Sequence, residues 1–320
     1  MIQQNVIYRV KSGSQLYGTS TPESDIDYVS VFIPSTYNLL SLQSCDFIDM
    51  SSKGAKEYRR NTNQDCDDQS HSLSRYLSLV AHGNPNLTEI LFAPTNVIEL
   101  ELPVFTEIKE NYNKLLSTKK VYDSFTGFAV AQRKKLEYKR VRYGELEIAL
   151  QYMQDILGDK LVDNKYKMDQ CTAENLNRLL QHYKGSKNNI EHFHVGLPLK
   201  IIYEKIKSEY ENYGWRLHTE SFKILGYDTK FASHTIRLLF EGEQLLLNGK
   251  LEYPLHDEVY IDIMNIKNGK LSIEEFKSMA YKYENRCREA LMNSSLPSKT
   301  DTKWINNWLV SVLKESILKE

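Results

Sequence analysis

The sequence has few cysteines, little glycine or proline, and no long apolar run. Its 320 residues include four cysteines, 14 glycines and eight prolines. The cysteines form no CxxC pair, which excludes the common zinc patterns and indicates reduced, intracellular thiols; they are Cys45, Cys66, Cys171 and Cys287. The shortage of glycine and proline is compatible with a helix-rich protein.

The sequence also lacks an excess of charge of either sign. Lysine and arginine number 41 and aspartate and glutamate 42, so binding to nucleic acid or to an acidic membrane through bulk charge is not indicated, although a local patch is compatible with this balance. Residues 1–5 have neither a charged start nor an apolar run, and no stretch approaches ~18 consecutive apolar residues. We therefore expect no signal peptide, no membrane-spanning helix and a cytoplasmic location.

The most informative segment joins a turn of small residues to two carboxylates. Residues 13–18 are GSQLYG, and residues 24–27 are SDID. In an extended strand, residues i and i+2 share a face, so Asp25 and Asp27 would direct their carboxylates to one spot. Divalent cations such as Mg²⁺ prefer oxygen ligands, and a Gly-Ser turn can hold a phosphate with backbone N–H groups and a hydroxyl. The combination predicts nucleotide chemistry that depends on Mg²⁺ or Mn²⁺.

An Asp-x-Asp pair alone is weak evidence, because such pairs also occur on loops and solvated strands. Here the pair begins an apolar strand, Ser24 directly precedes it, and a second glycine, Gly18, follows the Gly13-Ser14 turn. Two carboxylates buried side by side repel each other unless a cation compensates them. The surroundings therefore favour a metal site over a solvated strand.

Hydrophobic periodicity predicts an α+β fold, with a small mixed β-sheet head and a helical C-terminal region. The boundary falls near residue 104, giving parts 1–104 and 105–320 that could share a core. A polar loop is expected at about residues 51–68. The expected strands cover residues 6–10, 25–33 and 67–71, and the expected helices cover residues 73–81, 125–143, 145–156, 200–211, 230–247 and 273–292.

These motifs resemble the signature of the DNA polymerase β-like nucleotidyltransferase superfamily. The chain is similar, in particular, to the phage and bacterial predicted nucleotidyltransferases of the RNA repair pathway DNA polymerase β family. The similarity continues beyond the aspartates, through residues 72–77 (SLSRYL), 83–86 (GNPN), 89–92 (EILF) and 230–237 (KFASHTIR). It implies that residues 1–104 form the nucleotidyltransferase domain and that residues 105–320 form a mainly helical domain.

The resemblance also implies a third carboxylate on a neighbouring strand. Asp67 and Asp68 are the candidates, and the distance to the helix that follows favours Asp67. Adjacent strand residues face opposite ways, so the doublet leaves the choice open. Solvation of a loop is the alternative for both residues, and Asp65 and Glu57 are further substitutes.

The mechanism that the resemblance implies is two-metal phosphoryl transfer. Asp25 and Asp27 would hold both ions, and the third carboxylate would hold one ion and help to deprotonate an acceptor hydroxyl. The Gly13-Ser14 turn would bind the triphosphate of a nucleotide such as ATP, with Ser14 touching a terminal phosphate oxygen, and Gly18 and Ser24 are further candidates for nucleotide binding. The attacking hydroxyl would then displace pyrophosphate.

Two basic segments are candidates for further anion binding. On a helix, Lys230, His234 and Arg237 fall at i, i+4 and i+7, forming one polar stripe that suits a triphosphate or a nucleic-acid backbone. The alternative is a solvated face with a satisfied histidine. Residues 132–142 concentrate six basic side chains among tyrosines, which is typical of either a phosphate-backbone track or a solvated amphipathic helix.

The sequence therefore predicts transfer of a nucleoside monophosphate from a nucleoside triphosphate to a hydroxyl. The resemblance points to an RNA 3′ end, including that of tRNA, as the acceptor, and to the host cytoplasm if a phage encodes the protein. One alternative is nucleotidylation of a protein or a small molecule. Another is a catalytically silent protein that binds nucleotide or RNA.

Overall fold

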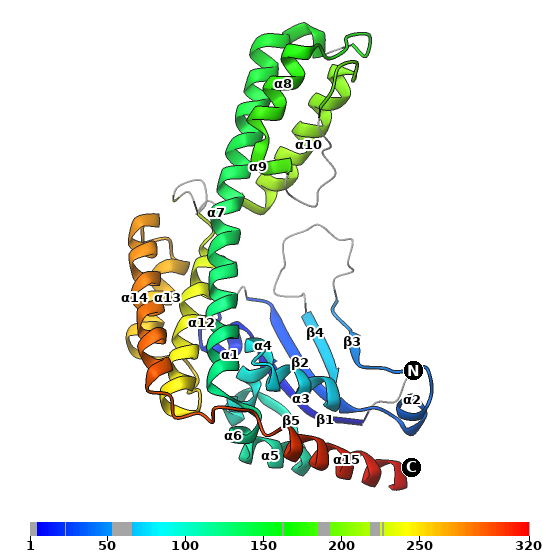
Figure 1. Cartoon of the computed structure of the whole chain (residues 1–320), viewed down its shortest axis with the longest axis vertical. Coiled ribbons are helices and arrows are strands. Elements are labelled where there is room, and N and C mark those ends of the chain that lie inside the picture. The colour runs from blue at the N-terminus through cyan, green and yellow to red at the C-terminus, as the bar shows by residue number, and fades with distance from the viewer. Residues whose placement is uncertain are drawn as a thin grey trace. The chain divides into compact units, whose positions relative to one another are not determined.

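The computed structural model describes residues 5–22, 24–52, 66–161, 163–184, 193–217, 225 and 227–319, without the side chains of 135, 137–140 and 212–217. Over these residues it has a mixed five-stranded sheet near the N-terminus and helices through most of the rest, so the predicted α+β class is confirmed (Figure 1). No described helix is both long and apolar enough to cross a membrane. Most of the polar loop expected at residues 51–68, including Glu57 and Asp65, lies outside the described residues.

The sheet has the strand order β3-β4-β2-β1-β5. Strands β2 and β4 run parallel, and the other neighbouring pairs run antiparallel. The three strands expected from the sequence are central, and β2 begins one residue later than predicted. The strands are β1 (Asn5–Ser12), β2 (Ile26–Ile33), β3 (Phe47–Asp49), β4 (Cys66–Ser72) and β5 (Ile98–Glu101).

One face of the sheet is covered by aromatic packing. Tyr8 on β1 is fully buried, its ring stacks on that of Phe105 with centroids 3.8 Å apart, and its hydroxyl donates to the Ile90 carbonyl at 3.0 Å. Tyr76 packs against the same Phe105 ring at 5.5 Å. These contacts join β1, in the centre of the sheet, to the helical segments that follow β4.

Helical periodicity located α3, α7, α10, α12 and α14 but missed α8, α13 and α15. The bounds of α3 and α14 agree with the predicted ranges, and residues 125–143 and 145–156 belong to one helix, α7, because Gly144 is tolerated within it. The helices up to α7 are α1 (Ser14–Tyr17), α2 (Thr36–Leu40), α3 (Leu73–Ala81), α4 (Pro85–Glu89), α5 (Pro103–Glu110), α6 (Tyr112–Leu115) and α7 (Thr118–Leu157). Those beyond it are α8 (Gln170–Leu179), α9 (Gln181–Lys184), α10 (Leu199–Leu217), α12 (Thr229–Asn248), α13 (Asp257–Lys267), α14 (Ile273–Met292) and α15 (Thr302–Lys319). Short 3₁₀ turns cover Ile90–Phe92, Thr95–Val97 and Gly158–Leu161.

The chain packs as two compact units. The first contains residues 1–129, 235–264 and 278–320, and the second contains residues 130–234 and 265–277. The sheet lies in the first unit, which also takes in most of α12, α13 and α14. The division at residue 104 refers to function and stays a prediction.

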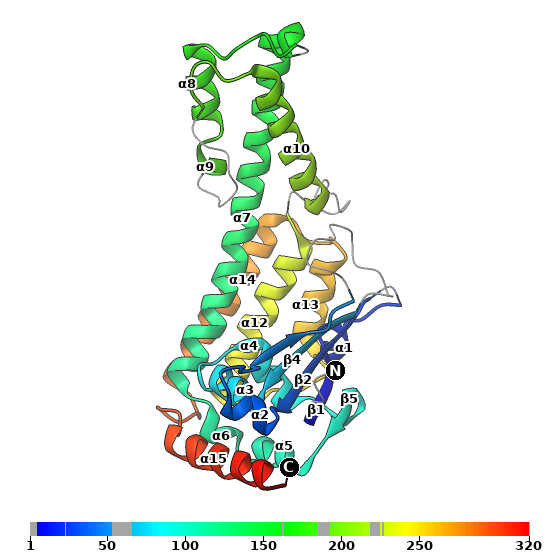
Figure 2. The same cartoon turned by 90° about the vertical axis from the view of Figure 1, so that its right-hand side faces the viewer.

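Helices α12, α13 and α14 run side by side in both views (Figures 1 and 2). Within the first unit, the Tyr283 hydroxyl donates to Asp262 at 2.9 Å, and Arg286 donates to Glu243 at 2.9 Å. These contacts tie α14 to α13 and to α12. They also supply matched controls for the residues discussed below.

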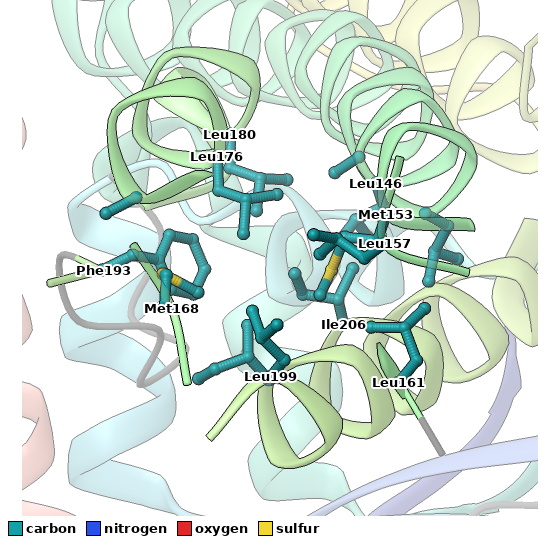
Figure 3. Close-up of a cluster of buried hydrophobic side chains, with 14 residues drawn as sticks. Leu146, Met153, Leu157, Leu161, Met168, Leu176, Leu180, Phe193, Leu199 and Ile206 are labelled. Carbon is teal, nitrogen blue, oxygen red and sulfur yellow. The ribbon is translucent and has the colours of Figure 1, made fainter. Parts of the chain in front are cut away.

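The second unit has its own hydrophobic core (Figure 3). Leucines and methionines from the C-terminal half of α7 meet side chains from α8 and α10. The labelled members include Leu146, Met153, Leu176, Leu199 and Ile206. Because these residues recur at helical spacing, the same amphipathic pattern that predicted the helices also supplies this core.

Truncation of this core should destabilise the second unit. Ile206 is fully buried, whereas Ile201 on the same helix is 52% exposed. We expect Ile206→Ala to lower the free energy of unfolding by about 2–5 kcal/mol, and Ile201→Ala by no more than about 0.5 kcal/mol. Urea denaturation followed by circular dichroism measures both changes, and equal losses would contradict the assigned core.

Candidate active site

Two carboxylates meet at one end of the sheet. Asp27 near the start of β2 pairs with Asp67 near the start of the parallel strand β4, and Asp27 also pairs with Ser12 at the end of β1. Paired residues on neighbouring strands lie on the same face, and the strands are about 4.8 Å apart. The structure therefore brings Asp27 and Asp67 together, on the face that also carries Tyr8 and Val31.

The turn after β1 touches this pair. Gly13 has a φ of 61°, and a β-carbon at this position would lie 2.5 Å from Asp27 Oδ2. Glycine is thus needed both for the backbone conformation and for the close approach of the carboxylate. Ser14 follows as the first residue of α1, and its hydroxyl makes no hydrogen bond to any described residue. The structure thus places the glycine-serine turn directly against Asp27, while the assignment of the turn and the aspartates to one functional site stays a prediction.

The electrostatics of this end of the sheet reflect crowded negative charge. Burial raises the pKa of the Cys66 thiol, and the nearby Asp68, Asp27 and Asp67 carboxylates raise it further. Asp25 lies just before β2, two residues from Asp27. Among the described residues, no three His, Cys, Asp or Glu side chains lie close enough together to hold a metal ion.

The donor set nevertheless fits Mg²⁺ as nucleotide enzymes use it. Mg²⁺ is commonly bound through one or two carboxylates, with substrate phosphates and water completing six ligands. Asp27 and Asp67 supply two carboxylates on one face, and like charges placed this close repel unless a cation compensates them. The chemistry of the pair therefore suits a divalent ion that arrives with a triphosphate.

Asp68 lies on the opposite face of the sheet. It pairs with Tyr28, and its two oxygens accept hydrogen bonds from the Arg9 guanidinium at 3.1 and 2.9 Å. Arg9 in turn stacks on the Tyr28 ring, with Cζ 4.1 Å from the centroid. This bidentate ion pair gives Asp68 a structural role and separates it from the Asp27–Asp67 pair.

Gly18 and Ser24 shape the local backbone. Gly18 ends α1 with a φ of 72°, and its N–H donates back to the Ser14 carbonyl. The Ser24 hydroxyl accepts from the Thr21 N–H at 2.9 Å in the turn before β2. Both residues were expected to contact nucleotide. In the structure, the Gly18 N–H and the Ser24 hydroxyl each have a hydrogen-bond partner within their own turn.

The cationic stripe expected at residues 230–237 is helical but is not uniform. Lys230 is exposed and His234 is half-buried, and both belong to the second unit. Arg237 belongs to the first unit, is 4% exposed, and is hydrogen-bonded to Glu89 and Glu241. Arg237 therefore cannot act as an exposed anion-binding cation as it stands. Several side chains of the basic run at 132–142 lie outside the described set.

Sequence analysis missed the partners of Arg237. Glu241 follows Arg237 at i+4, a spacing at which ion pairs form on helices, so this contact could have been predicted from the sequence. Glu89 is 148 residues away in the chain, and no local pattern joins it to Arg237. Tyr17 stood within the recognised GSQLYG turn but was not assigned a role.

Substituting Gly13 tests the close approach to Asp27. Gly13→Ala would drive a methyl group against Asp27 Oδ2, so we expect at least a tenfold loss of any activity that uses this carboxylate. Gly158→Ala is the control, because Gly158 also has a positive φ, 39°, but a methyl group there meets no atom within 4 Å. Turnover and the unfolding midpoint are measured for both variants. Equal activity losses in the two variants would contradict the proposed contact.

Comparisons with known proteins extend over most of the chain. The sequence matches the RNA repair pathway DNA polymerase beta family over residues 2–277. It is also 25% identical, over 332 residues, to a protein of Enterobacteria phage T4 described as an uncharacterized 38.9 kDa protein in the nrdC-mobD intergenic region. That alignment covers 95% of this chain and 96% of the phage protein. The family match includes the whole sheet, the glycine-serine turn and α12.

Proposed function

Because the chain belongs to the RNA repair pathway DNA polymerase beta family, as its motifs predicted, we propose that it is a nucleotidyltransferase. It transfers a nucleoside monophosphate from a nucleoside triphosphate to a hydroxyl and releases pyrophosphate. The observation that carries the proposal is the pairing of Asp27 with Asp67 directly against the Gly13 turn. Carboxylates in this number and position suit a magnesium-bound triphosphate.

Each residue of the site has a defined part in the proposal. Asp27 and Asp67 would hold Mg²⁺ or Mn²⁺, and Asp25 would be the further carboxylate available from the chain just before β2. An ion held there would supply positive charge to the triphosphate. The Ser14 hydroxyl donates to a terminal phosphate oxygen, and Asp67 accepts the proton of the attacking hydroxyl. Positioning and charge compensation then carry most of the catalysis, as is usual for phosphoryl transfer.

The acceptor that we propose is an RNA 3′ end, with tRNA as one candidate. The support is the family description, which refers to RNA repair. Catalysis would take place in the cytoplasm, or in the host cytoplasm if a phage encodes the chain; the similar protein of phage T4 supports the latter setting. Protein and small-molecule hydroxyls are the competing acceptors, and a silent binder would have none.

Label transfer tests the proposal. The protein is incubated with α-³²P-labelled nucleoside triphosphates, Mg²⁺, total RNA and cell lysate, and the labelled polymer is identified by nuclease and protease digestion. We expect nuclease-sensitive label that EDTA abolishes. Label in protein alone would refute the RNA acceptor, and no label with any acceptor, despite tight nucleotide binding, would favour the silent binder.

A further inference from the structure

The turn that carries Ser14 cannot hold its own position. Helix α1 has only four residues, and its N-cap, Gly13, supplies no side-chain hydrogen bond. An isolated helical turn of this length is unstable in water, because one or two hydrogen bonds do not offset the ordering of its backbone. The position of Ser14 relative to Asp27 must therefore depend on tertiary contacts.

Leu16 of α1 is fully buried, and Tyr17, the last residue of α1, makes three further contacts. Its hydroxyl donates to Glu89 Oε2 at 2.5 Å, and the Arg237 guanidinium stacks on its ring with Cζ 4.2 Å from the centroid. Its carbonyl accepts from the Leu255 N–H at 3.0 Å. Three separate segments of the first unit thus fix the C-terminal end of the turn.

Arg237 lies between two buried carboxylates. It is hydrogen-bonded to Glu89 and donates to the two oxygens of Glu241 at 3.0 and 2.8 Å, and Glu241 also accepts from the Tyr253 hydroxyl at 2.9 Å. Glu89 is 2% exposed and Glu241 is fully buried. Burial raises the pKa of Glu241 to about 8, against the opposing effect of the Arg237 charge.

A cluster of this kind is a poor way to gain stability alone. The desolvation of buried charges offsets most of their attraction, and apolar residues of similar volume commonly serve as well. The charged cluster adds a defined orientation of Tyr17. The Arg237 guanidinium stacks on its ring, and the Glu89 carboxylate accepts a hydrogen bond from its hydroxyl. The arrangement therefore suits the precise placement of a short turn.

We propose that Arg237 and Glu89 are positioning residues, which hold Tyr17 and thereby fix the Ser14 turn against Asp27 in the geometry that binds the triphosphate. This inference rests on the proposed nucleotidyltransferase function. It replaces direct anion binding by Arg237 with an indirect role: Arg237 sets nucleotide affinity without touching the nucleotide. Disturbing the cluster should consequently weaken nucleotide binding more than it slows turnover at saturation.

Tyr17→Phe tests this role with little disturbance, because it removes only the hydroxyl group that donates a hydrogen bond to Glu89. Tyr283→Phe is the matched control, since its hydroxyl also donates to a carboxylate, that of Asp262, in the same unit. We expect Tyr17→Phe to raise the Kd for a non-hydrolysable nucleoside triphosphate analogue with Mg²⁺ about tenfold, and Tyr283→Phe to leave it unchanged. Thermal melting of both variants verifies that they fold.

The outcomes separate the two proposals. If the wild-type protein binds the analogue and Tyr17→Phe has the same Kd as Tyr283→Phe, the positioning role is wrong and the nucleotidyltransferase proposal stands. If the wild-type protein does not bind the analogue, the nucleotidyltransferase proposal itself fails. A rise in KM for the triphosphate with nearly constant kcat in Tyr17→Phe supports positioning.

The pH dependence of binding gives a second readout. Glu241 interacts with Arg237 on its own helix, with Glu89 on α4 and with Tyr253 on the segment before α13. It also acts electrostatically on Tyr17 of α1. As the pH rises through about 8, Glu241 ionises, and two carboxylates then share one guanidinium. We expect the Kd of the wild-type protein for the analogue to rise above this pH and that of Glu241→Gln to stay level. Parallel profiles would overturn the role of the cluster.

Discussion

Replacing Asp67 by asparagine is expected to abolish nucleotidyl transfer, whereas the same change at Asp68 is expected to leave transfer nearly intact. Asp67 pairs with Asp27 beside the glycine-serine turn, and Asp68 is bound to Arg9 on the other face of the sheet. Loss of one carboxylate that we propose to hold the ion should lower kcat roughly 10³-fold, since a divalent ion stabilises a transferring phosphoryl group by several kcal/mol. Asp27→Asn should have the same effect as Asp67→Asn.

The order should be reversed for stability: Asp68→Asn should lower the free energy of unfolding more than Asp67→Asn. Asp68→Asn leaves Arg9 with a weaker partner, so it should lower the free energy of unfolding by about 1–3 kcal/mol. Asp67→Asn leaves the Arg9–Asp68 pair in place, so it should not incur this loss. Single-turnover kinetics and chemical denaturation of both variants give the comparison. A normal transfer rate in Asp67→Asn, or loss of transfer in Asp68→Asn, would contradict the assignment of Asp67 to catalysis and of Asp68 to the ion pair with Arg9.

Removing Arg237 should destabilise the first unit far more than removing an arginine that is partly exposed. Arg237→Met leaves Glu89 buried without its cation and Glu241 without its hydrogen-bond donor, and breaking a buried pair in this way costs about 3–5 kcal/mol near neutral pH. Arg286→Met is the matched control. Arg286 also lies between two glutamates, Glu243 and Glu258, but its side chain is 31% exposed, so its loss should cost about 1 kcal/mol or less.

The destabilisation should depend on pH with a defined sign. Without the guanidinium, no cation opposes the burial that raises the pKa of Glu241 in the folded state above its unfolded value. Such a group favours folding most when it is protonated, below the unfolded pKa of about 4.3, and this contribution is lost as the pH rises through the folded pKa. Arg237→Met should therefore recover part of its stability at pH 5 relative to pH 8. A loss that is equal at both pH values would contradict the buried-carboxylate explanation.

Local patterns in the sequence were sufficient for some of the helices, whereas α8, α13 and α15 were not predicted. Apolar spacing predicted α3 and α14 with their observed bounds, because both helices are amphipathic and bury one face. The GSQLYG turn and the aspartates after it predicted a turn beside a carboxylate, and the contact of Gly13 with Asp27 agrees with this. Helix bounds and the turn could be predicted because both depend on residues that are close together in the sequence.

The remainder depends on contacts between distant segments. The choice between Asp67 and Asp68 needs the parallel register of β4 on β2, and a shift of one residue would reverse it. The stripe at Lys230, His234 and Arg237 was read as one anion-binding face, yet helical spacing only says which residues share a face, not what covers it. Arg237 is covered by Glu89, and that packing is a property of the whole fold.

The central claim is that Asp27 and Asp67 together hold a divalent ion against a triphosphate. It is tested most directly by titrating the protein with Mn²⁺ and a non-hydrolysable nucleoside triphosphate analogue, and by counting bound Mn²⁺ and bound analogue after equilibrium dialysis. We predict that the wild-type protein and Asp68→Asn bind Mn²⁺ and the analogue together. Asp27→Asn and Asp67→Asn should lose the ion and bind the analogue weakly. Equal retention of Mn²⁺ and analogue by the wild-type protein and Asp67→Asn would contradict the account.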